Sequence, residues 1–262
     1  MEPRLPKVHL ISRPALDWPA IDRYLASVGA PNWVQAAAEH PAPDGQRLVE
    51  LMGRICYRSW SPGLNPNVSR VRTDHDAYLA NILDSGHGSV LEHANYTFIF
   101  QDVSRVLTHE LVRHRAGVAV SQESLRYVRL EDIPFDHPEY VRQNPELLEA
   151  AQRLLAEMER FQVLSAELTG IGEDGVSFHA KKAITSAARR YAPEGVLTTI
   201  GWTVNVRALR HVIALRTAPG AEDEIRALFG QVAALMRAEL PGLFSDFTPQ
   251  EDGSWIPAHP KV

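Results

Sequence analysis

Arginine, histidine and hydroxyl side chains gather in one stretch, residues 108–127, around a single glycine, Gly117. The polar members of this stretch include His109, Glu110, Arg113, His114, Arg115, Ser121, Gln122, Glu123, Ser124 and Arg126. Guanidinium groups bind phosphate through paired hydrogen bonds, and hydroxyl groups donate to phosphate oxygens. The stretch therefore indicates a small anionic ligand. The alternative is an ordinary helix end exposed to solvent, where cations are also favourable.

A second basic region runs from Ser177 to Arg216, where Glu194 is the only acidic residue. Its cations are Lys181, Lys182, Arg189, Arg190, Arg207, Arg210 and Arg216. Two positive stretches fit one ligand with two anionic ends, or two ligands. For Lys181 and Lys182 we favour a solvated face. Arg216 follows an apolar helical stretch, so we expect its guanidinium to point into a cleft.

Metal binding and a protein nucleophile are both disfavoured by residue spacing. His87 and His93 lie six positions apart, and His109 and His114 lie five apart, so neither pair has a typical ligand spacing, and we expect no metal. No G-x-S-x-G nucleophile motif and no glycine-rich nucleotide loop is present. The pattern therefore favours an enzyme whose difficult step belongs to a cofactor.

The composition limits the class of protein and its location. A net charge of -5 argues against a nucleic-acid partner. No apolar run approaches the roughly 18 residues of a membrane span, so we expect no membrane segment. A single cysteine, Cys56, fits a reducing compartment, and we expect a cytoplasmic protein. The length suits one domain over residues 1–262.

Periodicity predicts both strands and helices without a regular βα repeat. Strands are expected at 8–12, 95–101, 127–130 and 196–206. Helices are expected at 45–57, 74–83, 103–115, 145–169, 177–190, 208–216 and 221–239. The fold class is therefore α+β, a mixed sheet flanked by helices.

Connections and helix ends follow from residue type. The Pro-rich residues 13–43 and residues 121–126 read as connections. Asp102 is expected to cap the helix after the second strand. That helix would deliver Arg113 to Arg115 at its end, and Gly117 would break it.

Four blocks of sequence carry a family resemblance. Arg113-His114-Arg115 followed by Gln122-x-Ser124-x-Arg126-Tyr127 resembles the signature of the flavin-dependent thymidylate synthases. Upstream, the run Gly86-His87-x-Ser89-x-x-Glu92-His93 resembles a second block of that family. Downstream, Ala188-Arg189 and then Trp202 to Arg216 are similar to two more. The blocks occur in the family's order between about Cys56 and Arg216.

The resemblance implies an α+β homotetramer that binds FAD where subunits meet. The implied reaction methylates C5 of dUMP, with methylenetetrahydrofolate as carbon donor and NADPH as reductant. The implied flavin residues are His87, Ser89, Arg113, His114, Arg115, Asn205, Arg207 and His211. The implied nucleotide residues are Glu110, Arg113, Gln122, Glu123, Ser124, Arg126, Arg189 and Arg216. Arg216 matches the residue implied to activate the pyrimidine.

One feature departs from the family signature. Eight residues, 116–123, separate the Arg-His-Arg triplet from Ser124, where the family usually has seven. This difference keeps C5 methylation of UMP, as in nucleoside-antibiotic biosynthesis, as an alternative. Two other classes stay open from the residues: a nucleotide-binding protein without catalysis, and an RNA-binding module that uses the basic stretches.

Overall fold

The computed structural model describes residues 6–60, 65–68, 70–125 and 133–262. They form two compact units, each considered by itself. The first unit comprises Met1–Lys7, Phe100–Arg113 and Ser121–Gly201. The second comprises Val8–Ile99, His114–Val120 and Trp202–Val262.

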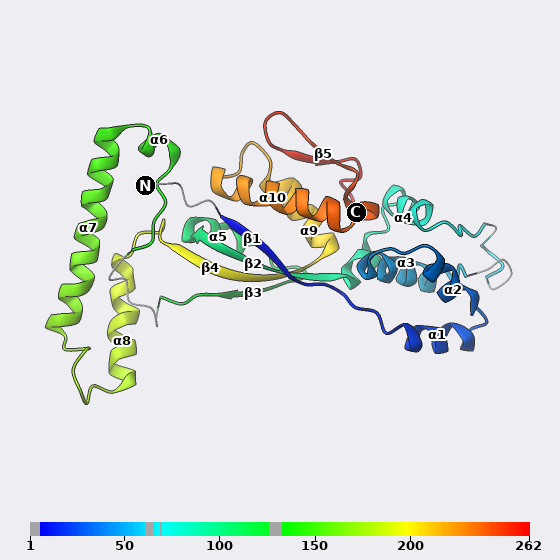
Figure 1. Cartoon of the computed structure of the whole chain (residues 1–262), viewed down its shortest axis with the longest axis horizontal. Helices are drawn as coiled ribbons and strands as arrows, with labels where there is room; N and C mark the ends of the chain where they lie inside the picture. The colour runs from blue at the N-terminus through cyan, green and yellow to red at the C-terminus, as the bar shows by residue number, and fades with distance from the viewer. Residues whose placement is uncertain (1–5, 61–64, 69, 126–132) are drawn as a thin grey trace. The chain divides into compact units, whose positions relative to one another are not determined.

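A four-stranded sheet has the order β1-β2-β4-β3, and its long strands contribute residues to both units (Figure 1). The strands are β1 (Lys7–Ser12), β2 (Asn95–Ser104), β3 (Val118–Gln122) and β4 (Leu197–Asn205). The expected alternation is confirmed, because Phe98 and Trp202 are fully buried. On the opposite face, the Thr97 and Thr203 hydroxyls share a 3.0 Å hydrogen bond.

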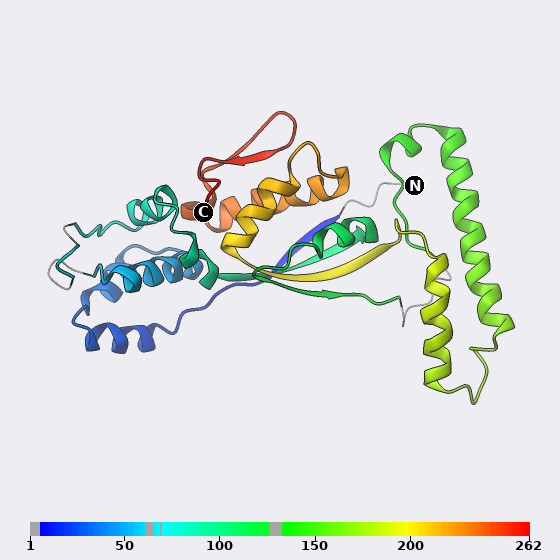
Figure 2. The same cartoon turned by 180° about the vertical axis from the view of Figure 1, so that it is seen from behind.

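Helices of the second unit cover the buried face of its strands, and α9 and α10 lie side by side in both views (Figures 1 and 2). The Trp202 ring packs between Phe98 on β2 and Phe229 on α10. The elements are α3 (Asp44–Tyr57), α4 (His75–Asp84), η1 (Gly88–His93), α9 (Val206–Arg216), α10 (Asp223–Glu239) and α11 (Pro241–Phe244). An antiparallel hairpin of β5 (Phe247–Pro249) and β6 (Trp255–Pro257) follows.

The expectation of a simple connection over residues 13–43 is wrong. Two helices, α1 (Trp18–Ser27) and α2 (Asn32–Glu39), occupy it. The Asp17 carboxylate accepts a 2.9 Å hydrogen bond from the Ala20 amide and so caps α1. Trp18 and Trp33 then stack, with ring centroids 6.0 Å apart. Pro19 stands in the first turn of α1, and Pro31 and Pro43 immediately precede α2 and α3, positions where proline is tolerated.

The first unit contains α5 (Arg105–Leu111), α6 (Glu139–Arg142), α7 (Pro145–Leu168), α8 (Phe178–Ala188) and η2 (Arg189–Tyr191). The Asn144 side chain caps α7, as its sequence indicates. Of its apolar side chains, Leu155 and Met158 pack against the small core around Val196. No residue of α7 is fully buried, and Leu154 and Leu168 are strongly exposed.

Three local expectations around α5 are wrong. Ser104, rather than Asp102, caps α5, because its hydroxyl accepts from the Leu107 amide at 3.1 Å. Asp102 stays in β2 with a positive φ of 58° and pairs with Lys7 at 2.9 Å. The helix ends at Leu111, before the Arg-His-Arg triplet, and residues 121–122 belong to β3 instead of a loop. The expected strand at 127–130 lies outside the described residues.

Candidate functional site

Gly117 fixes the turn that carries the Arg-His-Arg triplet toward β3. Its φ of 68° lies in the left-handed region that favours glycine. Its carbonyl accepts a 3.0 Å hydrogen bond from the Asn205 amide. A β-carbon at this position would overlap the Asn205 side-chain amide, so any larger residue must displace Asn205. The glycine predicted as a helix breaker instead allows this close approach of two chain segments.

Asn205 also starts the helix that carries three of the candidate site residues. Its side-chain oxygen accepts from the Ala208 amide at 2.8 Å and caps α9. Asn205 itself is buried, whereas the following helix presents Arg207 and His211 toward solvent and keeps Arg216 half-buried. The turn at Gly117 and the start of α9 are therefore fixed to each other through one residue.

Arg216 and His114 are two candidate site residues that a hydrogen bond joins directly. The Arg216 Nε donates to His114 Nε2 at 2.8 Å, so the neutral ring carries its proton on Nδ1. Burial, followed by the positive charges of Arg216 and His211, lowers the pKa of His114 to about 4. The His211 ring lies 6.3 Å from the His114 ring, nearly perpendicular to it. His114 is therefore neutral at pH 7.

A neutral acceptor has a consequence for the charge at this site. A carboxylate in the place of His114 would orient the guanidinium and also cancel much of its charge. The imidazole orients Arg216 through one hydrogen bond but adds no negative charge. The pair can therefore direct a positive charge at a ligand on which negative charge develops.

The segment η1 brings His87 and Glu92 close to α9 and α3. Glu92 Oε1 and Arg207 Nη1 form a 2.6 Å ion pair, and a β-carbon at Gly88 would lie 2.8 Å from Arg207 Nε. The His87 ring packs against the edge of the Tyr57 ring at 5.3 Å. Within the described residues, His87 Nδ1 is buried and makes no hydrogen bond. Ser89 is exposed on the same short helix.

The first unit holds most of the candidate nucleotide residues. Gln122 Nε2 donates to the Thr108 hydroxyl at 3.0 Å, and the Glu123 amide donates to the Thr199 carbonyl at 3.0 Å. Glu110 and Ser124 are half-buried, whereas Arg113 is exposed. Arg126 lies outside the described residues. The loop after β3 is thus fixed on one side by α5 and on the other by β4.

Arg105 belongs to this group although the sequence reading did not select it. Its Nη2 donates to the Glu123 carbonyl at 3.4 Å. Burial and the nearby positive charge of Arg189 lower the pKa of Arg105. Arg105 and Arg189 are therefore near enough to repel each other, and an anion between them would reduce this repulsion. In the sequence Arg105 lies three positions before the basic stretch of residues 108–127.

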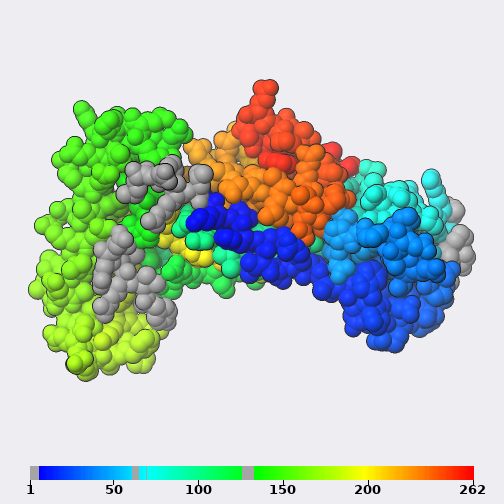
Figure 3. Space-filling view, in the orientation of Figure 1, coloured from blue at the N-terminus to red at the C-terminus, as the bar shows by residue number. Residues whose placement is uncertain are grey.

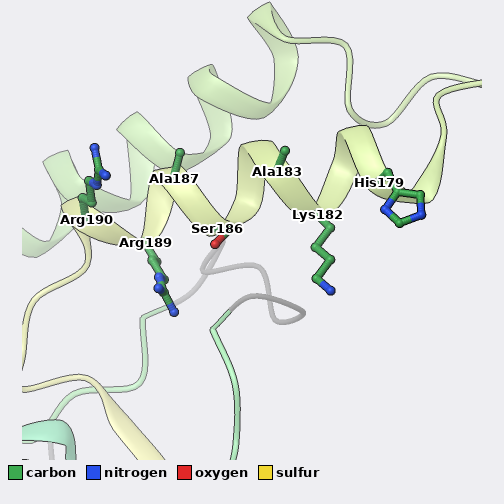
Figure 4. A pocket seen from close by; sticks show the side chains of 7 residues that line it. All are labelled: His179, Lys182, Ala183, Ser186, Ala187, Arg189 and Arg190. Atoms are coloured by element: carbon green, nitrogen blue, oxygen red, sulfur yellow. The ribbon is translucent and has the colours of Figure 1, made fainter.

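An open pocket of about 570 Å³ lies along α8 in the first unit. Its lining consists of His179, Lys182, Ala183, Ser186, Ala187, Arg189 and Arg190. Lys182, Ser186 and Arg189 extend from one side of the helix (Figure 4). Lys182 is half-buried and lines this open, basic pocket. Across the described ranges, no three His, Cys, Asp or Glu residues gather as metal ligands.

The family model described as thymidylate synthase complementing protein matches residues 38–242, most of the chain. A flavin-dependent thymidylate synthase from Mycolicibacterium gilvum is 37% identical over 223 residues, covering 84% of this chain and 87% of that protein. The chain belongs to the flavin-dependent thymidylate synthase family. The predicted family and its enzyme class, methyltransferase, are therefore confirmed.

More distant members of the flavin-dependent thymidylate synthases support the same assignment. The protein of that name from Corynebacterium aurimucosum is 34% identical over 236 residues, covering 88% of this chain and 92% of that protein. A crystal structure of thymidylate synthase X from Helicobacter pylori with FAD and dUMP is similar, with a TM-score of 0.52 and 23% identity. The match covers 77% of this chain and 93% of that one. This likeness confirms the α+β fold.

Proposed function

We propose that this chain catalyses the FAD-dependent reductive methylation of dUMP at C5. Methylenetetrahydrofolate would donate the carbon and NADPH would supply the reducing equivalents. The observation that carries the proposal is the Arg216–His114 pair, a cation oriented by a neutral acceptor within a flavin-dependent thymidylate synthase chain.

We assign FAD to the residues that match the family's flavin positions: His87, Ser89, Arg113, His114, Arg115, Asn205, Arg207 and His211. The fit is supported by the buried Nδ1 of His87, which has no hydrogen-bond partner in the described chain and can serve a ligand atom. It is also supported by the exposed cations Arg115 and Arg207, which suit an anionic diphosphate. When bound, the flavin would supply the hydride chemistry that no side chain of the protein can perform.

We assign the nucleotide to Glu110, Arg113, Gln122, Glu123, Ser124, Arg126, Arg189 and Arg216. Burial and, after it, the positive charge of Arg189 lower the pKa of Arg105, and a phosphate beside the two arginines would offset both effects. Gln122 at the end of β3, whose amide is oriented by its hydrogen bond to Thr108, and Ser124 just after it would contribute polar side chains to this site. Basic residues of the α8 pocket fit the same anionic class of ligand.

Arg216 would stabilise negative charge on the uracil ring. C5 of uracil is a weak nucleophile, so electron density must move into the ring as the new carbon bond forms. A guanidinium that is already oriented stabilises that charge without a further reorganisation step. His114 would hold the guanidinium and stay neutral, which preserves the field at the ring.

We further propose that the chain is a single functional domain that works as a cytoplasmic homotetramer with its sites at subunit contacts. Exposed apolar side chains on α7, including Leu154, Phe161 and Leu168, favour burial against another copy. The one cysteine is consistent with a reducing compartment. Within the described ranges, no helix has both the length and the apolarity to span a membrane.

The test is tritium release from 5-labelled dUMP and, in parallel, from 5-labelled UMP. Each assay contains FAD, NADPH and methylenetetrahydrofolate, because replacement of the C5 hydrogen by a methyl group frees the label. We expect release from dUMP and much less from UMP, since the relatives are thymidylate synthases. Equal or greater release from UMP would overturn the assignment of dUMP as the substrate. It would also indicate that the extra residue in the signature affects the choice of substrate. No release from either would overturn the proposal.

A further inference from the structure

Arg210 is a buried cation on the helix that carries Arg207, His211 and Arg216, yet no proposed catalytic role uses it. Its side chain is 2% exposed. Its Nη1 and Nη2 donate to the two Asp246 carboxylate oxygens at 2.7 Å and 2.8 Å. A buried guanidinium needs such pairing, because an isolated charge in the interior is strongly unfavourable. The two parallel hydrogen bonds also fix the direction of the side chain.

Arg210 makes its other contacts with the same C-terminal segment, Leu243–Val262. The guanidinium donates to the Leu243 carbonyl and, at 3.3 Å, to the His259 carbonyl. It also lies over the Phe247 ring, 4.8 Å from the centroid. Asp246 in turn accepts from the His259 amide at 3.3 Å. One arginine of α9 therefore joins the start, the hairpin and the end of this segment.

The segment also contacts the C-terminal cap of α9 and, near the N-terminal end of α9, lies against Gly88 of η1. At the C-terminal end, the Trp255 amide donates to the Thr217 hydroxyl at 2.9 Å, and Thr217 is fully buried. At the N-terminal end, Gly88 lies between Arg207 and Val262. A β-carbon there would be 2.8 Å from Arg207 Nε and 3.1 Å from the Val262 carbonyl carbon. In Figure 3 the C-terminal residues, drawn in red, pack directly on the orange residues of α10.

All of these contacts lie within the second unit, and the segment follows the residues that the family model matches, 38–242. We propose that Leu243–Val262 is a positioning element of the flavin site, with Asp246 as its positioning residue. Acting through Arg210, Asp246 fixes α9 so that Arg207 stays beside η1 and Arg216 stays on His114. The identity of the ligand as FAD rests on the proposed function, whereas the fixation of α9 does not.

The test is Asp246→Asn, which keeps the shape of the side chain but removes its charge. FAD affinity is measured by flavin fluorescence titration, and the mobility of α9 by amide hydrogen exchange without ligand. We expect FAD affinity to fall about 10-fold to 100-fold, the size seen when an orienting group is lost. We expect faster exchange in α9 at temperatures where the variant stays folded. Unchanged affinity together with unchanged exchange would overturn the inference.

Two further variants separate positioning from stability. Glu239→Gln removes another ion pair of the same unit, formed with Arg13 at 2.7 Å, and should change neither readout. The double variant Arg210→Met/Asp246→Leu replaces the buried pair by apolar side chains, which often preserves stability. If this variant is as stable as the parent chain but binds FAD weakly, positioning is supported. Parental FAD affinity in it would overturn the role of the ion pair.

The two proposals fail in different ways. A parent chain that binds no FAD would overturn the proposed function, and hydrogen exchange in α9 would still decide the positioning role. Parent-like exchange in Asp246→Asn would then overturn that role on its own.

Discussion

The second unit contains two clusters built from arginine and histidine, and the two clusters differ in the group that accepts hydrogen bonds from the arginines. In the first, Glu50 accepts from Arg47 at 2.8 Å, from Arg54 at 2.9 Å and from His75 at 2.6 Å. These four side chains are at most 8% exposed. The Trp33 indole adds a fourth hydrogen bond at 3.0 Å. The carboxylate at the centre pairs with both arginines and offsets part of their positive charge.

In the second cluster, a neutral imidazole stands where the first has a carboxylate. Arg216 donates to His114, and both side chains are only partly buried. Clusters of similar residue types can therefore serve different roles: one stabilises the fold, and the other is a candidate for ligand binding. In the Glu50 cluster the arginines pair with a buried carboxylate, and the contact of this carboxylate with His75 joins α3 to α4. In the His114 cluster the group that orients the arginine carries no negative charge.

Glu50→Gln should have the largest effect, because it leaves two buried arginines without their counter-charge. We expect a loss of about 3–5 kcal/mol in the free energy of unfolding, measured by urea denaturation. Glu149→Gln is the control, because Glu149 pairs with Arg153 on an exposed surface and should cost less than about 1 kcal/mol. Equal effects of the two variants would contradict the role of Glu50 as a buried counter-charge that stabilises the fold.

Arg216→Ala should affect turnover and leave the fold intact. We expect kcat to fall about 100-fold to 1,000-fold, as when one group that stabilises developing charge is removed. FAD should stay bound, which its visible spectrum would report. The matched control is Arg23→Ala, an exposed arginine of α1, with parental turnover. Near-normal turnover in Arg216→Ala would remove the catalytic role assigned to it.

The smallest expected effect is a pH dependence that separates the two clusters. Because the folded pKa of His114 is about 4, below the usual 6.5, the unfolded chain binds more protons between these values. Stability should therefore fall as pH drops from 6.5 to 4, by about 1 kcal/mol once solvent screening of this half-buried group is allowed for. The measurement is the free energy of unfolding as a function of pH. In His114→Asn this free energy should change less between pH 6.5 and pH 4 than in the parent chain. A curve with the same slope in the variant would contradict the assignment.

The Glu50 cluster should respond in a lower pH window. Burial, the strongest influence, raises the pKa of Glu50, but hydrogen bonds from His75 and Trp33 and the charge of Arg54 outweigh it and hold the pKa at about 2. Its contribution to stability is complete above about 4.5 and is lost as pH falls toward 2. His114→Asn should leave this lower window unchanged.

Much of the fold was predictable because its signals are local or periodic. The alternation through Tyr96, Phe98 and Phe100 gave β2, and Asn144 before Pro145 gave α7. The errors arose where tertiary contacts, rather than local sequence, determine the secondary structure. The stacking of Trp18 on Trp33 helps hold two helices together in a stretch rich in proline. At the start of α5, Ser104 rather than Asp102 accepts the hydrogen bond from a backbone amide.

The sequence indicates candidate site residues but not the contacts between them. Motif order selected His114 and Arg216 as candidates, yet 101 positions lie between them, and no local pattern predicts that one donates to the other. Arg105 was missed because its position beside Arg189 depends on the fold. The role of Gly117 as a contact for Asn205 is likewise a property of two distant segments.

The central claim is that His114 stays neutral and orients Arg216 without adding a negative charge. The direct measurement is the titration of His114 by NMR in protein labelled with ¹⁵N-histidine, its signal identified by its absence in His114→Asn. We predict a pKa of about 4 and a proton on Nδ1 at pH 7. A pKa at or above 6.5, or a proton on Nε2, would contradict the account.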